Sequence, residues 1–339
     1  MVMTLTRRAL VAGALCVAAL AGADAQAQTR TVKLAKQFGI SYLPLTIMEQ
    51  KGFLEDEGKK LGLDLKSEWI QFSAGNAMNE AILSGNLDFA SGGVGPLLTI
   101  WSRTRANIGV KAVAALNAMP LFLNTINPNV KTIADFTEKD RIALPAVRTS
   151  IQAVTLQMAS EKTFGPGQHG KLDAWTVSLG HPDAQAAMMG GQSGITAHFT
   201  SAPFMYDELA DPRVRKVLDS YDVLGGPHTF NLVWSQGKLA KEEPKLIRAF
   251  VAALDRSIKH IKADPADAAV TWTKAEKSRM SAAEAEKMIR LPENEWTMTP
   301  KKIMAYAEFM ARTGVIPSKP DTWKDLFFED IHSDDLVTQ

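Results

Sequence analysis

One supersecondary unit occurs twice in this chain, and it limits the possible folds more than any other feature. In each copy an apolar strand pattern runs into a loop rich in Gly, Ser or Thr, and a helix pattern follows. Gly85 and Pro96 bracket one strand and loop, and Gly191 and Pro203 bracket another at nearly the same separation. Strands that alternate with helices predict a parallel sheet with helices on both faces. The sequence therefore predicts an α/β protein of two lobes built on one plan.

Helix and strand signals place the individual elements. In the first copy we expect strands at Thr31–Lys36, Leu63–Ile70 and Leu87–Ser91, with helices that begin near Pro44, Asn76 and Pro96. In the second copy we expect strands at 141–144, Ala174–Leu179 and Ile195–Phe199, with helices after Ser150 and from Asp183 and Pro203. A returning strand, Phe230–Ser235, leads into helices over Glu243–Ala263, from Pro265, from the capping box Ser281–Glu284, and over Pro300–Thr313.

This order of elements predicts how the chain divides. We expect a first lobe of residues 30–118 plus 228–339, which includes the C-terminal helices, and a second lobe of residues 119–227. The chain then crosses between the lobes twice, near Ala114–Leu121 and near Gly225–Asn231. Two such crossings predict a hinge.

The N-terminus has the features of a secretory signal, residues 1–27. Arg7 and Arg8 precede the apolar run Ala9–Ala23, and small residues follow as cleavage sites after Ala25 or Ala27. The run of about 15 residues is shorter than the roughly 20 that a membrane span needs. We therefore expect export to the periplasm by the Sec route, although the arginine pair also fits twin-arginine export. Leu15 stands where a lipoprotein signal has a small residue, so Cys16 is expected to leave with the signal.

Composition excludes several classes of function. The chain has 38 Lys and Arg residues against 37 Asp and Glu residues, so no basic excess exists to neutralise a nucleic-acid backbone. It has one Cys and six His, and no two His are closer than 12 positions, which excludes thiolate metal sites and H-E-x-x-H zinc hydrolases. We expect no metal, no cofactor and no nucleic-acid partner.

The loops at the carboxyl ends of the expected strands are the candidate site, because open α/β sheets bind ligands there. Helix N-termini in these loops offer backbone N–H groups and partial positive charge to an anion, and Arg148 would add a full charge. A single Ser or Gly in such a loop is explained equally well as a helix cap. The candidate residues are Gly39, Ser41, Tyr42, Ser73, Gly75, Asn76, Gly93, Gly95, Arg148, Thr149, Ser150, His198 and Thr200.

Catalytic motifs are not supported. Residues 165–171 match G-x-x-x-x-G-K, but Leu172 replaces the Ser or Thr that binds magnesium, and a helix rather than a strand precedes them. No G-x-S-x-G elbow occurs. Asp183 is the one carboxylate in the strand-end loops and is expected to cap a helix. We expect a protein that is not an enzyme.

Four segments carry a resemblance to a known family: Lys51–Leu54, Phe72–Gly75, Glu80–Phe89 and Gly92–Pro96. They resemble the periplasmic substrate-binding proteins of ABC importers for nitrate, sulfonates, taurine and thiamine-pyrimidine precursors, the NMT1/THI5-like family. The similarity covers essentially the whole mature chain and is most specific in this N-terminal block. It implies a two-lobed periplasmic-binding-protein fold of type II, with two parallel-rich sheets, two crossover strands and closure over one ligand. It also implies an ABC permease and an ATPase as partners.

These observations predict a monomeric solute-binding protein that captures a small organic or inorganic anion, such as a sulfonate, taurine or nitrate, by hinge closure. Two alternatives remain open at this point. One is a neutral thiamine-pyrimidine precursor stacked on Tyr42 and His198. The other is an exported enzyme or a sensor component on the same fold. The pyrimidine-forming enzymes of this superfamily carry a cysteine-rich iron-binding motif, and the mature chain has no cysteine.

Overall fold

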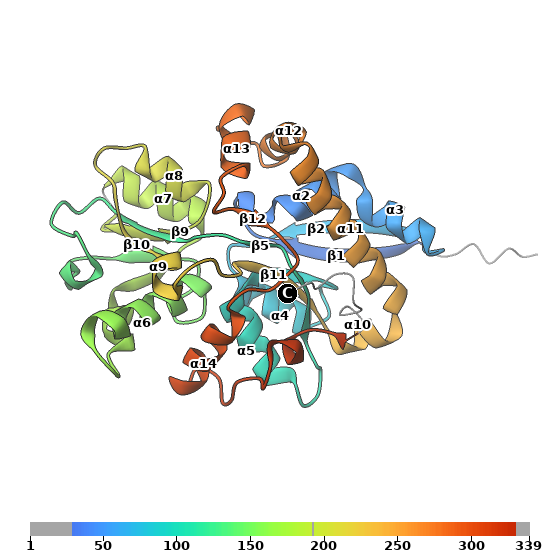
Figure 1. Ribbon diagram of the computed structural model, residues 1–339, viewed down its shortest axis with the longest axis horizontal. Coiled ribbons are helices and arrows are strands. Elements are labelled where there is room, and N and C mark those ends of the chain that lie inside the picture. Colours follow the sequence, from blue (N-terminus) through green and yellow to red (C-terminus); the bar gives the residue numbers. More distant parts are fainter. Residues whose placement is uncertain (1–28, 192, 330–339) are drawn as a thin grey trace, which may run out of the picture.

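The computed structural model describes residues 29–191 and 193–329 (Figure 1). The expected signal, residues 1–27 with Cys16, lies outside these ranges. Within them, no helix combines the length and the apolar character that a membrane crossing requires. Figure 1 shows two lobes side by side, each with strands at its centre and helices on both sides.

The first lobe contains mixed β-structure. β1 (Arg30–Lys36) pairs in parallel with β2 (Leu65–Gln71), and one parallel bridge, Leu34 to Phe89, joins β1 to the segment ahead of β3 (Ala90–Gly93). β11 (Asn231–Ser235) lies antiparallel between β3 and β4 (Lys111–Ala115). These antiparallel pairs arise because β11 returns from the second lobe, so the sheet is mixed where the sequence predicts parallel pairing.

The helices of the first lobe begin close to where the sequence predicts. Gly52 ends the first of them in the left-handed conformation at φ 63°, a backbone state that glycine adopts without a steric cost. A short helix, Phe53–Lys60, begins directly after Gly52, and the sequence signals did not predict it. The elements are the 3-10 turn η1 (Ile40–Tyr42), α2 (Leu43–Lys51), α3 (Phe53–Lys60), α4 (Gly75–Leu83) and α5 (Val94–Thr104).

The second lobe has a five-stranded sheet in the order β10-β6-β9-β7-β8. β7 is parallel to both of its neighbours, whereas β6 is antiparallel to both of its own. The strands are β6 (Phe122–Thr125), β7 (Ile142–Leu144), β8 (Thr176–Ser178), β9 (Ala197–Thr200) and β10 (Arg215–Asp219).

Helices cover both faces of this sheet, with α7 and α8 on one side and α6 and α9 on the other in Figure 1. They are α6 (Ile151–Phe164), α7 (His181–Gly190), α8 (Phe204–Leu209) and α9 (Ser220–Leu224), with the 3-10 segments η2 (Ile133–Asp135) and η3 (His169–Trp175). Asp183 does not cap α7, contrary to our expectation. The N-cap is Gly180, and Asp183 lies in the first turn, where its charge favours the helix dipole.

The two crossings between the lobes pair with each other. The β5 strand (Asn117–Ala118) lies beside the segment that enters β11: Ala118 bridges Thr229, and the Leu116 N–H donates to the Asn231 carbonyl at 2.8 Å. A third strand, β12 (Glu295–Trp296), pairs with β5. The boundaries between the lobes that we expected at residues 118 and 228 stay a prediction. Both positions lie in the two crossing segments that pair with each other.

The C-terminal third of the chain is mainly helical. α11 packs against α2 and α3, and α12 packs against α2, whereas α14 contacts both α5 and α6 and so reaches each lobe. Ser281 and Glu284 form the predicted capping box at the start of α13. The elements are α10 (Gly237–Glu242), α11 (Pro244–Ala263), α12 (Pro265–Ala275), α13 (Ala282–Ile289), α14 (Ile303–Arg312) and η4 (Trp323–Leu326).

Candidate functional site

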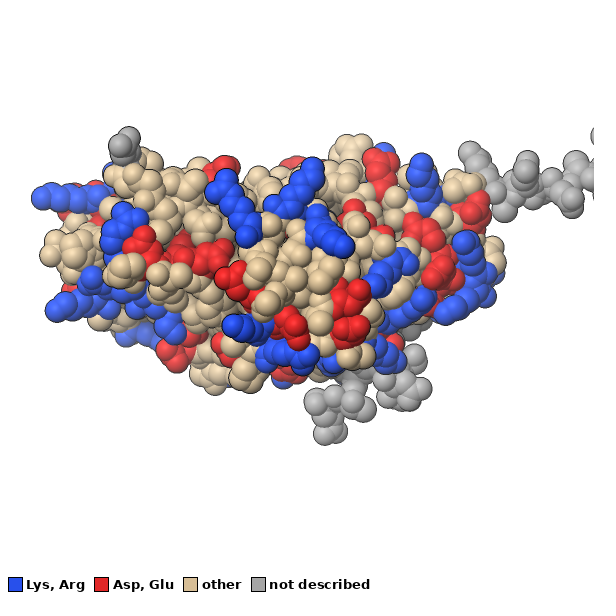
Figure 2. Space-filling model, turned by 90° about the horizontal axis from the view of Figure 1, so that it is seen from above, with Lys and Arg blue, Asp and Glu red and all other residues tan. Residues whose placement is uncertain are grey.

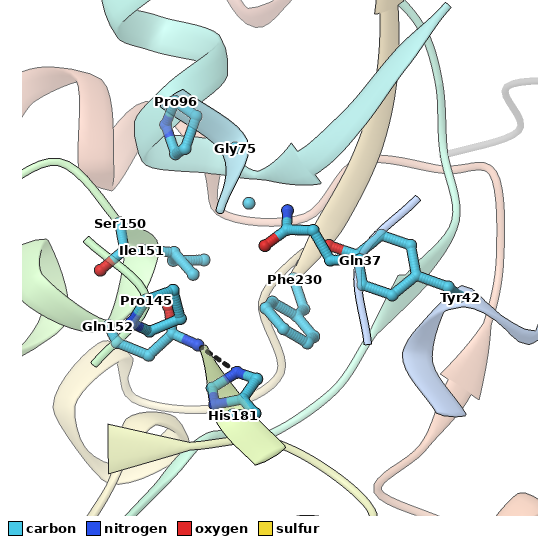
Figure 3. A pocket seen from close by; sticks show the side chains of 11 residues that line it. Gln37, Tyr42, Gly75, Pro96, Pro145, Ser150, Ile151, Gln152, His181 and Phe230 are labelled. Atoms are coloured by element: carbon cyan, nitrogen blue, oxygen red, sulfur yellow. Dashed lines mark hydrogen bonds between the residues drawn. The ribbon is translucent and has the colours of Figure 1, made fainter. Parts of the chain in front are cut away.

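A pocket lies between the lobes where the strand-end loops meet, and we call it the central pocket (Figure 3). Its empty space of about 300 Å³ includes open solvent, and only about 20 Å³ of it is free for the centre of a water-sized sphere. Residues of both lobes and of one crossing line it. They are Gln37, Tyr42, Gly75, Gly93, Pro96, Pro145, Ser150, Ile151, Gln152, His181 and Phe230.

Four helices begin at this pocket. Gly75 is the first residue of α4 and Gly93 is the N-cap of α5, both in the first lobe. Ser150 is the N-cap of α6 and His181 is the first residue of α7, both in the second lobe. The first N–H groups of a helix have no partner within the helix, and together with the aligned peptide dipoles they attract negative charge. The central pocket is therefore electropositive without a cationic side chain.

The side of the pocket next to the crossings is held by buried amides. The Tyr42 hydroxyl donates to Asn231 Oδ1 at 3.2 Å, and Asn231 Nδ2 donates to Ser41 Oγ at 2.9 Å. Asn117 Nδ2 donates to the Ser41 carbonyl at 2.5 Å. Complete burial of the Tyr42 ring raises the pKa of its hydroxyl far above the usual range, so the phenol stays neutral. These bonds fix the loop after β1 to both crossing segments.

The pocket wall of the second lobe is formed by Gln152 and His181. Gln152 Nε2 lies 3.4 Å from His181 Nε2 (Figure 3). Burial lowers the pKa of His181 well below its ordinary value, and the nearby His198 lowers it further, so His181 is a neutral imidazole. None of the described residues that line the pocket carries a formal charge.

The two lobes are closed around this pocket. The Ile40 N–H donates across the cleft to the Ala202 carbonyl at 3.2 Å. A Cβ added at Gly93 would lie 2.6 Å from Ile151 Cγ2, and one added at Gly95 would lie 2.5 Å from the Thr149 carbonyl oxygen. Glycine at these two positions lets the backbones of the lobes approach to contact distance.

The structure brings some of the predicted residues to the pocket and not others. Tyr42, Gly75, Gly93 and Ser150 line it. Gly39, Ser73, Gly95 and Thr149 lie at contacts between the lobes beside it, Ser73 against Gly180. Ser41, His198 and Thr200 are fully buried behind its wall. Asn76 and Arg148 are exposed, and Arg148 has a left-handed backbone at φ 63°.

Seven lining residues were absent from the candidate set. Gln37 and His181 lie within loops that the sequence indicated, but neither was selected from them. Ile151 and Gln152 are the first two residues of α6, and Phe230 belongs to a crossing. A single amide or aromatic residue has no characteristic spacing, so only the packing of the two lobes identifies these positions.

A second hollow, the lateral groove, also has residues of both lobes in its lining and lies between α7, α8 and the end of α12. Phe38 and Gly39 line it, next to Gln37 of the central pocket, and so do Gln185, Trp272 and Arg279. On the face shown in Figure 2, basic and acidic side chains are interspersed, in keeping with the balanced composition. Within the described residues, no group of three or more His, Cys, Asp or Glu side chains could hold a metal ion.

The chain matches the model of the NMT1/THI5-like family over residues 40–268, which is more than half of its length. The chain belongs to the NMT1/THI5-like family. For this NMT1/THI5-like protein, a comparison with curated proteins finds no match.

Solved structures similar to this NMT1/THI5-like protein include three binding proteins. The alkanesulfonate-binding protein SsuA from Xanthomonas axonopodis pv. citri, bound to MOPS, is 18% identical at a TM-score of 0.67, with 85% of this chain and 94% of that chain covered. The aliphatic sulphonate-binding SsuA from Escherichia coli is 16% identical at 0.63, with 88% and 92% covered. The nitrate-binding protein NrtA from Synechocystis PCC 6803 is 14% identical at 0.61, with 78% and 70% covered. At these identities the likeness shows the periplasmic-binding-protein fold.

Proposed function

We propose that the protein is the exported solute-binding component of an ABC importer and that it holds a small anion between its lobes. The observation that carries this proposal is the convergence of four helix N-termini, two from each lobe, on the central pocket. Helix N-termini bind anions with backbone N–H groups and dipole charge alone. The sulfonate- and nitrate-binding names of the similar structures agree with such a ligand.

The side chains of the pocket suit an anion for a second reason. Gln37 and Gln152 each carry an amide NH₂, and no described lining residue is a carboxylate that would repel negative charge. The Ser150 hydroxyl already accepts from the Ala153 N–H and donates to the Ala146 carbonyl, so it organises the start of α6. Neutral donors around a desolvated anion supply charge-assisted hydrogen bonds.

Closure links ligand capture to delivery. An ABC permease, driven by its ATPase, would recognise the two lobes in the relative position that the bound ligand stabilises. The paired crossings between Asn117 and Asn231 form the hinge, and residues 1–27 direct the protein to the periplasm, where it acts as a monomer. A reporter fused to residues 1–28 should leave the cytoplasm, and its retention there would contradict this location.

A neutral thiamine-pyrimidine precursor is the second candidate ligand. One observation favours it: Tyr42 and Phe230 place aromatic rings in a pocket whose described lining has no charged side chain. Amides of Gln37 and Gln152 can donate to and accept from a heterocycle. His198, which the sequence suggested as a stacking partner, is buried behind His181.

The experiment is a thermal-unfolding screen of residues 28–339 against ethanesulfonate, taurine, nitrate and an aminopyrimidine. A ligand at a hundredfold excess over its Kd stabilises the folded protein by about 2.7 kcal/mol. We expect an anion to raise the melting temperature and the aminopyrimidine to leave it unchanged. The opposite pattern would assign the neutral ligand.

Two matched variants locate the binding site. Gln152→Leu removes a donor from the central pocket and should weaken anion binding about tenfold, the effect of about 1.4 kcal/mol of lost hydrogen bonding. Gln185→Leu makes the same change in the lateral groove and should leave the affinity unchanged. Loss of binding in Gln185→Leu but not in Gln152→Leu would place the anion in the groove and overturn the proposed site.

A further inference from the structure

A row of buried polar side chains runs from the central pocket into the second lobe. His181 Nδ1 lies 2.9 Å from His198 Nε2, and His198 Nδ1 lies 2.6 Å from Glu208 Oε1. At the deep end, Asn124 Nδ2 donates to Glu208 Oε2 at 2.9 Å. At the pocket end, Gln152 Nε2 lies 3.4 Å from His181 Nε2. Each of these five side chains is at most 7% exposed.

Each contact between neighbours in the row holds one proton, so the position of one proton sets the others. With Glu208 ionised, His198 donates from Nδ1 to the carboxylate, and its Nε2 accepts from the Nδ1–H of His181. His181 Nε2 then carries a lone pair and accepts from the Gln152 amide. In this state the imidazole at the pocket wall is a hydrogen-bond acceptor.

Addition of one proton reverses the direction of each hydrogen bond between Gln152 and Glu208. The proton binds His181 Nε2, the His181 Nδ1 proton passes to His198 Nε2, and the His198 Nδ1 proton passes to Glu208 Oε1. All three groups end neutral, and no proton has to reach Glu208 directly from solvent. His181 Nε2 is now a donor, so the Gln152 amide turns over to accept with Oε1. Its NH₂ group moves to the position that the oxygen held, which gives the pocket wall an additional donor.

We propose that Glu208 is a positioning residue that sets the hydrogen-bonding polarity of the central pocket through His198 and His181, so that anions bind with uptake of one proton. The inference rests on the proposed anion-binding function and explains why a carboxyl and two imidazoles are buried behind the pocket. Burial of such groups is costly unless they are hydrogen-bonded, and here they form one continuous row.

The groups around Glu208 set the pH at which the row gains or loses its proton, and this pH lies within the range of ordinary binding experiments. Burial raises the pKa of Glu208 to about 8, partly offset by the Asn124 bond, and burial lowers the pKa of His198 to about 3. On α8 itself, the pKa of the neighbouring Asp207 carboxyl is raised to about 6. Burial is the largest cause, and the negative charge of Glu208 is the second. α7 contributes His181 and the exposed Asp183, and β9 contributes His198. β6 and β7 contribute no titratable side chain, and no Lys or Arg among the described residues is bonded to Glu208.

The test uses ethanesulfonate, which stays ionised at every pH used, so that a pH dependence belongs to the protein. We expect its Kd to rise by up to about tenfold between pH 7 and pH 9, because binding then requires a proton that the free protein lacks. Calorimetry in buffers of different ionisation enthalpy should show uptake of close to one proton at pH 9. An equal Kd at both pH values would overturn the proposal.

Two variants separate this role from simple packing. In Glu208→Gln the amide donates to His198 Nδ1 and accepts from Asn124, which fixes the donor state, so the Kd should be low and independent of pH. Asp207→Asn removes the adjacent carboxyl and should keep a pH-dependent Kd, with the midpoint moved to lower pH because the repulsion between the two carboxylates is lost. A wild-type profile in Glu208→Gln would contradict the proposal, as would a flat profile in Asp207→Asn.

A measurement without ligand keeps this test separate from the proposed function. In ¹⁵N-histidine spectra of the ligand-free protein, His181 should carry its proton on Nε2 at pH 6 and on Nδ1 at pH 9. If no anion binds but the tautomer changes in this way, the anion function fails and the relay stands. If the His181 tautomer is the same at both values, the relay is wrong whatever the ligand.

Discussion

Gly95 of the first lobe faces the Thr149 carbonyl of the second lobe so closely that a Cβ at Gly95 would lie 2.5 Å from the oxygen. This distance is too short for a real contact between a carbon and a backbone oxygen. Gly95 lies within α5 at a backbone conformation open to other residues, so the space across the cleft, rather than the local backbone, requires glycine there. The contact exists only when the lobes are closed.

Gly95→Ala should therefore hinder closure without unfolding the protein. We expect the Kd for ethanesulfonate to rise at least about tenfold, while the ligand-free melting temperature stays equal or rises, because Ala favours a helix over Gly. Calorimetry and thermal unfolding measure the two quantities. Gly190→Ala is the matched control, since a Cβ at that helical position meets nothing within 4 Å. Unchanged affinity in Gly95→Ala would show that this contact does not limit binding.

Arg148 should affect anion binding only through long-range electrostatic attraction, because its exposed position places it outside the described lining of the pocket. Arg148→Ala should slow association of an anion by a few-fold at low ionic strength and have no effect at about 1 M salt, where the screening length falls to about 3 Å. Stopped-flow binding at two salt concentrations measures this. A tenfold loss of affinity that persists in high salt would instead indicate direct contact with the anion.

Asn231 ties the loop after β1 to the crossings. Asn231→Ala removes the acceptor of the Tyr42 hydroxyl and the donor to Ser41 Oγ, and both partners are buried. We expect the free energy of unfolding to fall by about 1–3 kcal/mol, the cost of unpaired buried polar groups. Urea unfolding measures the change. Asn76→Ala, at an exposed site, is the control, and an equal effect in both variants would contradict a special role for Asn231.

Glu208 should make stability fall as pH rises. Its pKa is higher in the folded protein, about 8, than the ordinary 4.5, so the unfolded chain releases its proton first and stability is lost as pH rises through this interval. His198 acts oppositely, but only below its ordinary pKa of 6.5. Between pH 6.5 and 8, wild type should lose about 1–2 kcal/mol relative to Glu208→Gln. Urea unfolding of both proteins at the two pH values measures this, and a constant difference would contradict the raised pKa.

Local signals predicted the regular elements well. The glycine after α2, the proline at the start of α12 and the capping box of α13 all mark real helix ends, because these residues act on their own turns. The short strands β4 and β6 were missed. Their residues are buried almost throughout, so the alternation that identifies a half-exposed strand is absent. Four apolar residues in a row follow Lys111 in β4, and two apolar residues precede two polar ones in β6, so neither strand alternates.

The candidate site was predictable at the level of loops and not of side chains. Gly75, Gly93 and Ser150 were found because helix starts have recognisable residues. His181 lies 2.9 Å from His198, but 17 positions separate them, and only the packing of α7 against β9 brings them together. Gln37 and Gln152 come from different lobes, and they line one pocket only because the two lobes are closed.

In our proposal, helix N-termini and neutral donors hold a small anion in the central pocket. Titration calorimetry of residues 28–339 with ethanesulfonate at pH 6.5, repeated for Gln152→Leu, tests it most directly. We predict one site per chain with a Kd of about 1 μM or lower, and a Kd about tenfold higher in the variant. Heat from an aminopyrimidine with none from ethanesulfonate, taurine or nitrate would contradict the claim.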